Sequence, residues 1–149
     1  MIQNEKKTRL KTTHFVEIAL WSEKTADVYE MTPLLEIEPS GCWIKGDPIA
    51  LMGTHIRQKK AYLYQESCWF YRLAERSDSD IQKDLDEIYQ KFKPRAKAIK
   101  EIKQKYGMRA TVCVVIYPKN GELPYLNFGM EFIEFMAEIG AELDFDICG

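Results

Sequence analysis

The residues whose types and spacing offer the most chemistry lie in an acidic stretch at the end of the chain. Between Asn120 and Gly149 there are seven acidic residues and no Lys or Arg. Such a stretch could steer and dock a basic protein partner through electrostatic complementarity. The alternative is a solvated surface without a partner. The residues predicted to bind the partner are Glu131, Glu134, Glu138, Glu142, Asp144 and Asp146.

Three of these carboxylates, on Glu142, Asp144 and Asp146, would also suit a divalent metal or an acid–base pair, since alternate residues of a strand point to the same side. Charges on the outer face of an edge strand also prevent sheets from aggregating, and a Ca²⁺ or Mg²⁺ site needs further oxygen ligands. We therefore favour the surface interpretation and expect no metal and no cofactor.

Other catalytic features are absent from the sequence. There is no phosphate-binding P-loop, no dinucleotide-binding glycine turn, no nucleophile elbow and no H-E-x-x-H motif. The two histidines, His14 and His55, open a strand-like run and lie in a loop-like run, where a structural or solvated role is common. The four cysteines are widely spaced, as in reduced core thiols. The sequence therefore predicts a protein that is not an enzyme.

Aromatic residues interleave with basic ones between Arg57 and Arg72, a pattern found in proteins that bind single-stranded nucleic acid. The formal net charge of −2 gives no long-range attraction to phosphate, so we do not expect nucleic acid as a partner. A binding groove for a small ligand or nucleotide is the second hypothesis. Its predicted residues are Trp43, Lys45, Asp47 and Trp69.

The segment from Lys91 to Arg109 has the opposite charge, with eight basic residues against one acid, Glu101. A solvated helix face explains this segment as well as a function does, because cations favour the C-terminal end of a helix.

Hydrophobic periodicity predicts the elements that must position these residues. Alternation or apolar runs indicate strands at His14–Trp21, Cys42–Lys45, Lys60–Leu73, Ala110–Tyr117 and Ala141–Ile147. Helical spacing indicates a short helix near Thr25–Leu35, a long one from Ser79, with Gln82 completing a capping box, to Tyr106, and another at Asn127–Ile139. Pro94 should kink or split the long helix. The run at Ala110–Tyr117 is apolar on both faces, which favours the centre of the sheet.

These elements predict an α+β fold. We expect one domain over residues 13–149, with a mixed, mostly antiparallel sheet of about five strands and two main helices packed on it, preceded by a polar basic tail over residues 1–12. No apolar run is long enough to cross a bilayer or to serve as a secretory signal, so we expect a cytoplasmic protein without a membrane partner.

Three segments carry a family resemblance: LLEIEPSGCWIKGDP, the strand with Trp69, and the block from YGMRATVCVVIY to MEFIEFMAEIGAELDFDI. Together they resemble the bacterial family known as domain of unknown function 4279, over roughly residues 14–148. The resemblance implies a compact α+β domain without a known activity. It also suggests an accessory role, one form of which is an immunity protein that neutralises a toxin of the same cell.

The first hypothesis is therefore a partner-binding accessory protein, most concretely an immunity protein whose acidic C-terminal surface docks a basic toxin domain. The second is the ligand-binding or nucleotide-binding module described above. A third, an enzyme that uses Asp144 and Asp146 with a divalent metal, is the least favoured.

Overall fold

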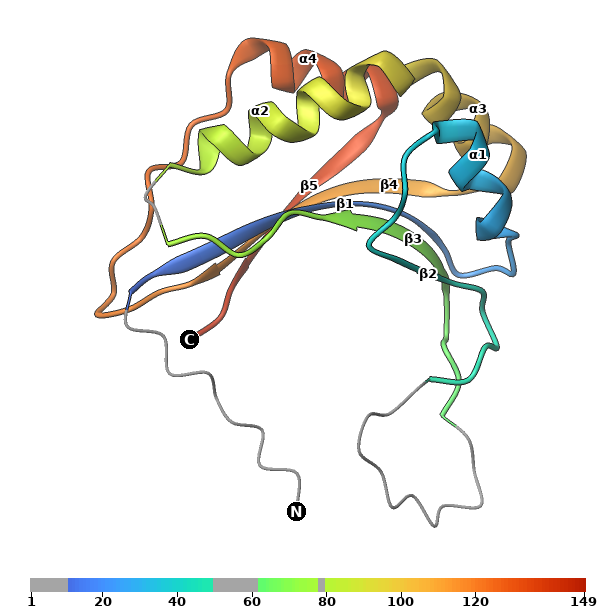
Figure 1. Ribbon diagram of the computed structural model, residues 1–149, viewed down its shortest axis with the longest axis horizontal. Coiled ribbons are helices and arrows are strands. Elements are labelled where there is room, and N and C mark those ends of the chain that lie inside the picture. The colour runs from blue at the N-terminus through green and yellow to red at the C-terminus, as the bar shows by residue number, and fades with distance from the viewer. Residues whose placement is uncertain (1–10, 50–61, 78–79) are drawn as a thin grey trace.

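The computed structural model describes residues 11–49, 62–77 and 80–149 (Figure 1). Some residues of the sequence analysis lie outside these ranges. They are His55, the basic residues from Arg57 to Lys60 at the start of the aromatic run, and Ser79, which was predicted to cap the long helix. In chain order the elements are β1 (Thr13–Ser22), η1 (Val28–Glu30), α1 (Met31–Leu35), β2 (Gly41–Trp43), β3 (Ser67–Arg72), α2 (Ile81–Phe92), η2 (Lys93–Arg95), α3 (Ala96–Tyr106), β4 (Arg109–Tyr117), α4 (Met130–Ile139) and β5 (Ala141–Ile147).

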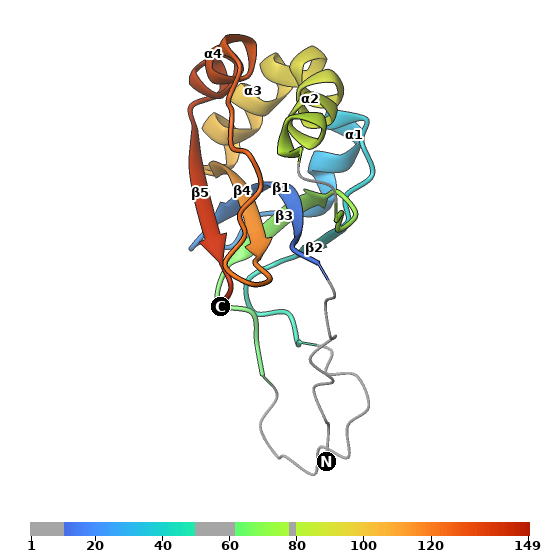
Figure 2. The ribbon, with the colours of Figure 1, turned by 90° about the vertical axis from the view of Figure 1, so that its left-hand side faces the viewer.

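The five strands form one mixed sheet in the order β2-β3-β1-β4-β5. Three pairings are antiparallel, and only β4 with β5 is parallel. Helices α2, α3 and α4 cover one face of this sheet, which gives two layers (Figures 1 and 2). The predicted α+β class, the single domain and the mixed, mostly antiparallel sheet are confirmed.

The core lies between these two layers. The alternation of β1 turns Val16, Ile18 and Leu20 toward the helices, and all three are buried. The apolar stripes of α2 and α3 meet them with residues such as Leu85 and Ile99. The predicted strand and helix faces are therefore the ones that form the core.

The prediction of the sheet centre was wrong, because β1 and not β4 is the middle strand. Strand β4 is interior, and its residues Thr111 and Val115 are buried even though they point away from the helices. An apolar pattern on both faces indicates that a strand is buried on both sides of the sheet. The pattern does not indicate how many strands lie on either side of that strand.

Pro94 splits the long predicted helix, as expected. It lies in the 3₁₀ helix η2 between α2 and α3, because proline lacks the N–H that a continuous helix would need there. Asp80 caps α2 by accepting a hydrogen bond from the backbone N–H of Gln82 at 3.0 Å. In the described ranges the layer thus contains three helices of ten or more residues in place of the two predicted main helices.

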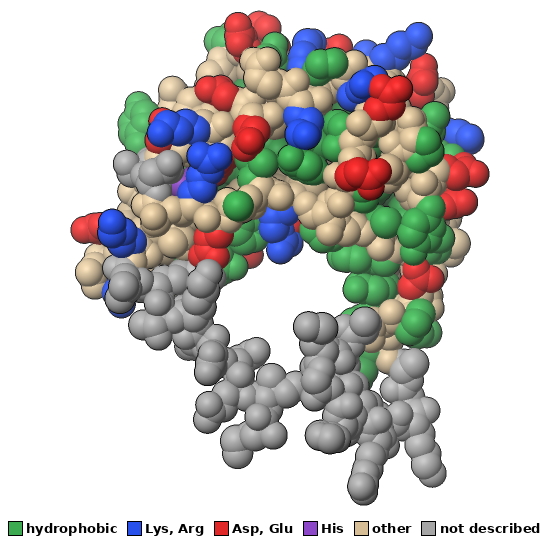
Figure 3. Space-filling model, in the orientation of Figure 1, with side chains coloured by type: hydrophobic (Ala, Val, Ile, Leu, Met, Phe, Trp, Pro, Cys, Tyr) green, Lys and Arg blue, Asp and Glu red, His purple; other side chains and the backbone are tan. Residues whose placement is uncertain are grey.

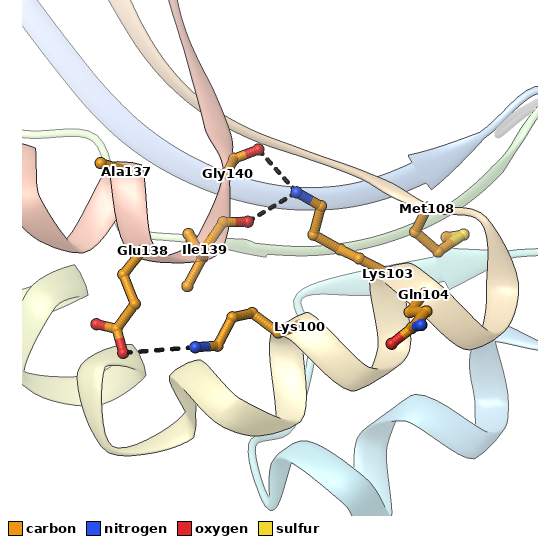
Figure 4. A pocket seen from close by; sticks show the side chains of 8 residues that line it. All are labelled: Lys100, Lys103, Gln104, Met108, Ala137, Glu138, Ile139 and Gly140. Carbon is orange, nitrogen blue, oxygen red and sulfur yellow. Dashed lines mark hydrogen bonds and ion pairs between the residues drawn. The ribbon is translucent and has the colours of Figure 1, made fainter.

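Helix α4 ends at Gly140, which has a left-handed φ of 60°. The Lys103 ammonium on α3 donates hydrogen bonds to the carbonyl oxygens of Ile139 and Gly140 at 2.7 and 2.8 Å (Figure 4). These carbonyls belong to the last turn of α4, where no amide of the helix remains to bond them. Lys103 therefore joins α3 to the start of β5. Within the described ranges, no helix has the length and apolar character that crossing a bilayer requires.

Candidate functional site

The face of the sheet that points away from the helices is the main candidate site, and we call it the uncovered face because no described helix lies on it (Figures 1 and 2). The sheet curves so that this face is concave (Figure 1), and the space-filling view shows the hollow beneath it (Figure 3). Strand register fixes which residues share the face, because paired residues point to the same side. One row across four strands is Arg72, Glu17, Cys113 and Asp144.

Aromatic rings line the half of the uncovered face near β2 and β3. The Trp43 ring stacks on Tyr64 with 4.3 Å between centroids, and Phe70 lies 5.5 Å from Trp43. The Phe70 ring lies directly over Gly41, where a Cβ atom would come within 2.7 Å of it. The absence of a side chain at Gly41 thus lets the Phe70 ring approach β2 closely.

Arg72 occupies the middle of this aromatic group. Its guanidinium lies 4.6 Å from the centroid of the Phe15 ring and 5.2 Å from that of Phe70. It also forms an ion pair with Glu17 at 2.6 Å. A shallow hollow of about 600 Å³ opens beside these residues, with Tyr117 and Ser40 on its border. The hollow is therefore lined by aromatic rings and by the Arg72 guanidinium, whose charge is neutralised by Glu17.

The acidic side of the uncovered face belongs to β5. The carboxylate of Glu142 accepts two hydrogen bonds from Arg109 at 2.6 and 2.8 Å, and the Arg109 guanidinium lies 4.6 Å from the Trp21 ring. Asp144 and Asp146 have no ion pair or hydrogen bond within the described part of the chain. Two of the three β5 carboxylates are therefore available to a partner.

Cys113 lies between these carboxylates and Glu17. Burial, together with Glu17, Asp144 and Asp146, raises the pKa of its thiol to about 11. Burial likewise raises the pKa of Cys68 to about 12. Both thiols are protonated at neutral pH, and a protonated thiol is a poor nucleophile and metal ligand.

The six predicted acidic residues fall into two groups. Glu142, Asp144 and Asp146 point to the uncovered face, whereas Glu131, Glu134 and Glu138 lie on α4 in the helical layer. Glu138 forms a hydrogen-bonded ion pair with Lys93, which lowers the pKa of its carboxyl group, and it lies 3.9 Å from Lys100. The structure therefore does not bring all six together on one surface.

The predicted ligand residues are also divided. Trp43 lies on the uncovered face, but Trp69 is fully buried in the core, where its Nε1 donates a hydrogen bond to the Thr32 hydroxyl at 3.1 Å. Lys45 bonds the backbone oxygen of Glu23, and Asp47 accepts a 2.9 Å hydrogen bond from the Ile44 amide. Two neighbouring residues of a sheet ladder point to opposite sides, so Trp43 and Trp69 cannot line one pocket.

His14 belongs to a cluster of charged and polar side chains that links three parts of the fold. It is fully buried, and its Nε2 lies 3.0 Å from the carboxylate of Asp84, which is also fully buried. The Arg76 guanidinium lies 2.9 Å from the other oxygen of that carboxylate. The cluster ties β1 to α2 and to the segment after β3. The described ranges contain no group of three or more His, Cys, Asp or Glu that could hold a metal ion.

Sequence reasoning missed most of the uncovered face, including Phe15, Glu17, Phe70 and Arg72. A signal for it was present, because the second face of β1 carries Phe15, Ala19 and Trp21, which is more apolar than a solvent-facing strand requires. A second cavity, of about 380 Å³, lies between α3 and α4 (Figure 4). Its charged groups, Glu138, Lys100 and Lys103, form an ion pair with one another or hydrogen bonds with the end of α4.

These features define a class: a two-layer α+β domain whose five-stranded sheet carries helices on one face and a concave, partly aromatic surface on the other. A family model described as domain of unknown function (DUF4279) matches residues 11–149, and the chain belongs to this family. The predicted resemblance is thereby confirmed as to family. No curated protein and no solved structure matches the chain.

Proposed function

We propose that this protein is a binding protein without catalytic activity, and that the uncovered face with its acidic β5 side docks a basic partner protein. The observation that carries the proposal is the pair Asp144 and Asp146, which form no ion pair or hydrogen bond with a described residue, whereas Glu17 and Glu142 on the same face are each held by an arginine. Unpaired carboxylates on an accessible strand attract a cationic surface and speed its association.

The rest of the uncovered face suits a protein partner. Tryptophan, tyrosine and arginine are enriched at the centres of protein interfaces, because they bury much area and keep a polar group available. Trp43, Tyr64 and Arg72 supply these residue types around a concave surface. A convex basic domain would complement both the shape and the charge.

In its finer form, the proposal is that the partner is a toxin domain and that the protein acts in the bacterial cytoplasm as its immunity protein. Nuclease toxins present basic substrate grooves, and an acidic surface that covers such a groove blocks it. The resemblance described above and the charge of β5 both support this form.

The decisive experiment measures association with the protein encoded by the neighbouring gene, using surface plasmon resonance at low ionic strength. The double variant D144K/D146K should associate at least about tenfold more slowly than the unchanged protein, because it replaces attraction with repulsion. The matched control E131K/E134K makes the same change in net charge on α4, and it should reduce the rate much less.

Equal effects of the two double variants would show that only total charge matters and would overturn docking at β5. Absence of binding by the unchanged protein to that neighbour would overturn the partner proposed here. Thermal unfolding of both variants provides the control for folding, since all four positions are exposed.

A further inference from the structure

Strand β5 forms one end of the sheet. On one side it pairs with β4 over seven positions, from Ala110 with Ala141 to Ile116 with Ile147. On its other side, no strand of the described ranges pairs with it. An unpaired edge presents a row of N–H and C=O groups that another extended chain can bond. The segment AELDFDI contains no proline or lysine, two residues that commonly obstruct such an edge.

The side of β5 that faces the helical layer is apolar and poorly covered. Leu143, Phe145 and Ile147 are 36%, 45% and 52% exposed, although their neighbours on β4 in the register are buried. The Phe128 ring contacts Phe145, with 5.7 Å between centroids, but it leaves nearly half of that side chain accessible. An added strand would complete the cover over these three side chains.

Helix α4 extends this apolar strip. Glu138 marks the flank of α4 that faces η2 and α3, since it pairs with Lys93 and Lys100. Ile133 lies five residues earlier, which places it about 140° around the helix, on the flank away from α3. It is 48% exposed. The helical layer therefore has an apolar flank above the outer edge of β5.

The side of β5 on the uncovered face is acidic, and this determines which charge an added strand should carry. Glu142, Asp144 and Asp146 point to the uncovered face, and the last two are unpaired within the described residues. If two copies of β5 paired edge to edge with their helices on the same side, the acidic residues of both would lie on one face, where like charges directly opposite destabilise the pair. A second copy of this chain is thus disfavoured, and a strand with Lys or Arg at these positions is favoured.

We infer that the outer edge of β5 accepts an extended segment of the partner protein as a sixth strand, and that this segment alternates apolar residues with Lys or Arg. Its apolar side chains cover Leu143, Phe145 and Ile147, while its cations face Asp144 and Asp146. This inference rests on the proposed function and specifies the part of the partner that is recognised. Main-chain hydrogen bonds supply affinity in such strand addition, and the alternating side chains supply specificity.

The test uses blocked seven-residue peptides matched to the length of β5. The probe alternates Lys and Val, and a control peptide alternates Glu and Val. Amide hydrogen exchange measured by NMR on the whole protein should slow at β5 when the Lys–Val peptide is added, and not when the Glu–Val peptide is added. The variant D144K/D146K should reverse this preference. A Lys–Val peptide that leaves β5 exchange unchanged would overturn the inference.

A second control separates strand pairing from attraction between charges. The Lys–Val peptide N-methylated at its three central residues keeps its charge but cannot donate main-chain hydrogen bonds there. It should bind at least about tenfold more weakly if β5 accepts a strand. Equal affinity of the two peptides would reduce the effect to electrostatics and overturn the inference. If the intact partner binds in a manner that depends on Asp144 and Asp146 while β5 exchange is unaltered, the proposed function stands and only strand addition fails.

Discussion

At the scale of single residues, the neighbours of each charge decide what it can do. Six acidic residues are equivalent in the sequence pattern, yet Glu138 and Glu142 are held by Lys93 and Arg109. Asp144 and Asp146 form no ion pair or hydrogen bond with a described residue. Their charges instead act on Cys113, whose thiol they help to keep protonated. Burial raises the pKa of this thiol most, and Glu17 and the two aspartates raise it further, so the anions that could attract a partner also help to keep the cysteine unreactive.

We predict a steep pH dependence for alkylation of Cys113. Because its pKa is raised to about 11, the thiolate fraction should grow about tenfold per pH unit between pH 7 and pH 9.5 in the folded protein. Iodoacetamide labelling followed by peptide mass spectrometry measures the rate. In urea the rate should level off near the ordinary thiol pKa, and the same levelling in the folded protein would contradict a raised pKa.

At the scale of elements, two helices end on left-handed glycines whose surroundings differ. Gly107 after α3 and Gly140 after α4 have φ values of 63° and 60°. A Cβ atom at Gly107 would meet nothing within 4 Å, whereas one at Gly140 would come within 2.7 Å of the Lys103 Nζ. The second helix end is therefore coupled to α3, and through it β5 is held in place (Figure 4).

We predict that Gly140→Ala lowers the free energy of unfolding more than Gly107→Ala does. Both substitutions force alanine into a left-handed conformation, at a cost of roughly 1–2 kcal/mol. Gly140→Ala also displaces Lys103 from two carbonyl oxygens, which adds roughly 0.5–1.5 kcal/mol. Urea unfolding of both variants measures the difference. In a Lys103→Met background the two substitutions should cost the same, and a persistent difference would exclude the role assigned to Lys103.

At the scale of the whole molecule, the domain presents two accessible surfaces of different character. The uncovered face is concave and partly aromatic, and the outer edge of β5 has an apolar side and an acidic side. In the strand addition proposed above, the charge at this edge disfavours a second copy and favours a basic strand. On this proposal, the acidic residues disfavour self-association through β5 while its edge keeps the capacity to pair.

We predict that the unchanged protein and the D144K/D146K variant associate with each other more strongly than either associates with itself through β5. In the mixture, opposite charges face one another across the two edges, whereas each protein alone places like charges there. Sedimentation equilibrium at low salt measures the association, and hydrogen exchange at β5 locates it. The E131K/E134K variant has the same net charge and should not pair with the unchanged protein in this way.

Much of the fold was determined by the sequence itself, because it depends on local spacing. The apolar stripe along α2 and α3, the interruption at Pro94 and the alternation in β5 identify these elements without reference to the rest of the chain. They are enough to predict one α+β domain with a mixed sheet. The family resemblance also follows from short segments such as the one that contains Trp43.

Only the tertiary structure decided which residues make the candidate site. Trp43 and Trp69 look alike in sequence, but the helices cover the face that holds Trp69 and leave the other uncovered. Arg72 meets Glu17 across a sequence separation of 55 residues, and no local pattern predicts such a pairing. The alternation of apolar and polar residues shows that the two faces of a strand differ. Which face is covered, and which charges are neutralised, depends on elements distant in the chain, so it is decided only when the layers pack.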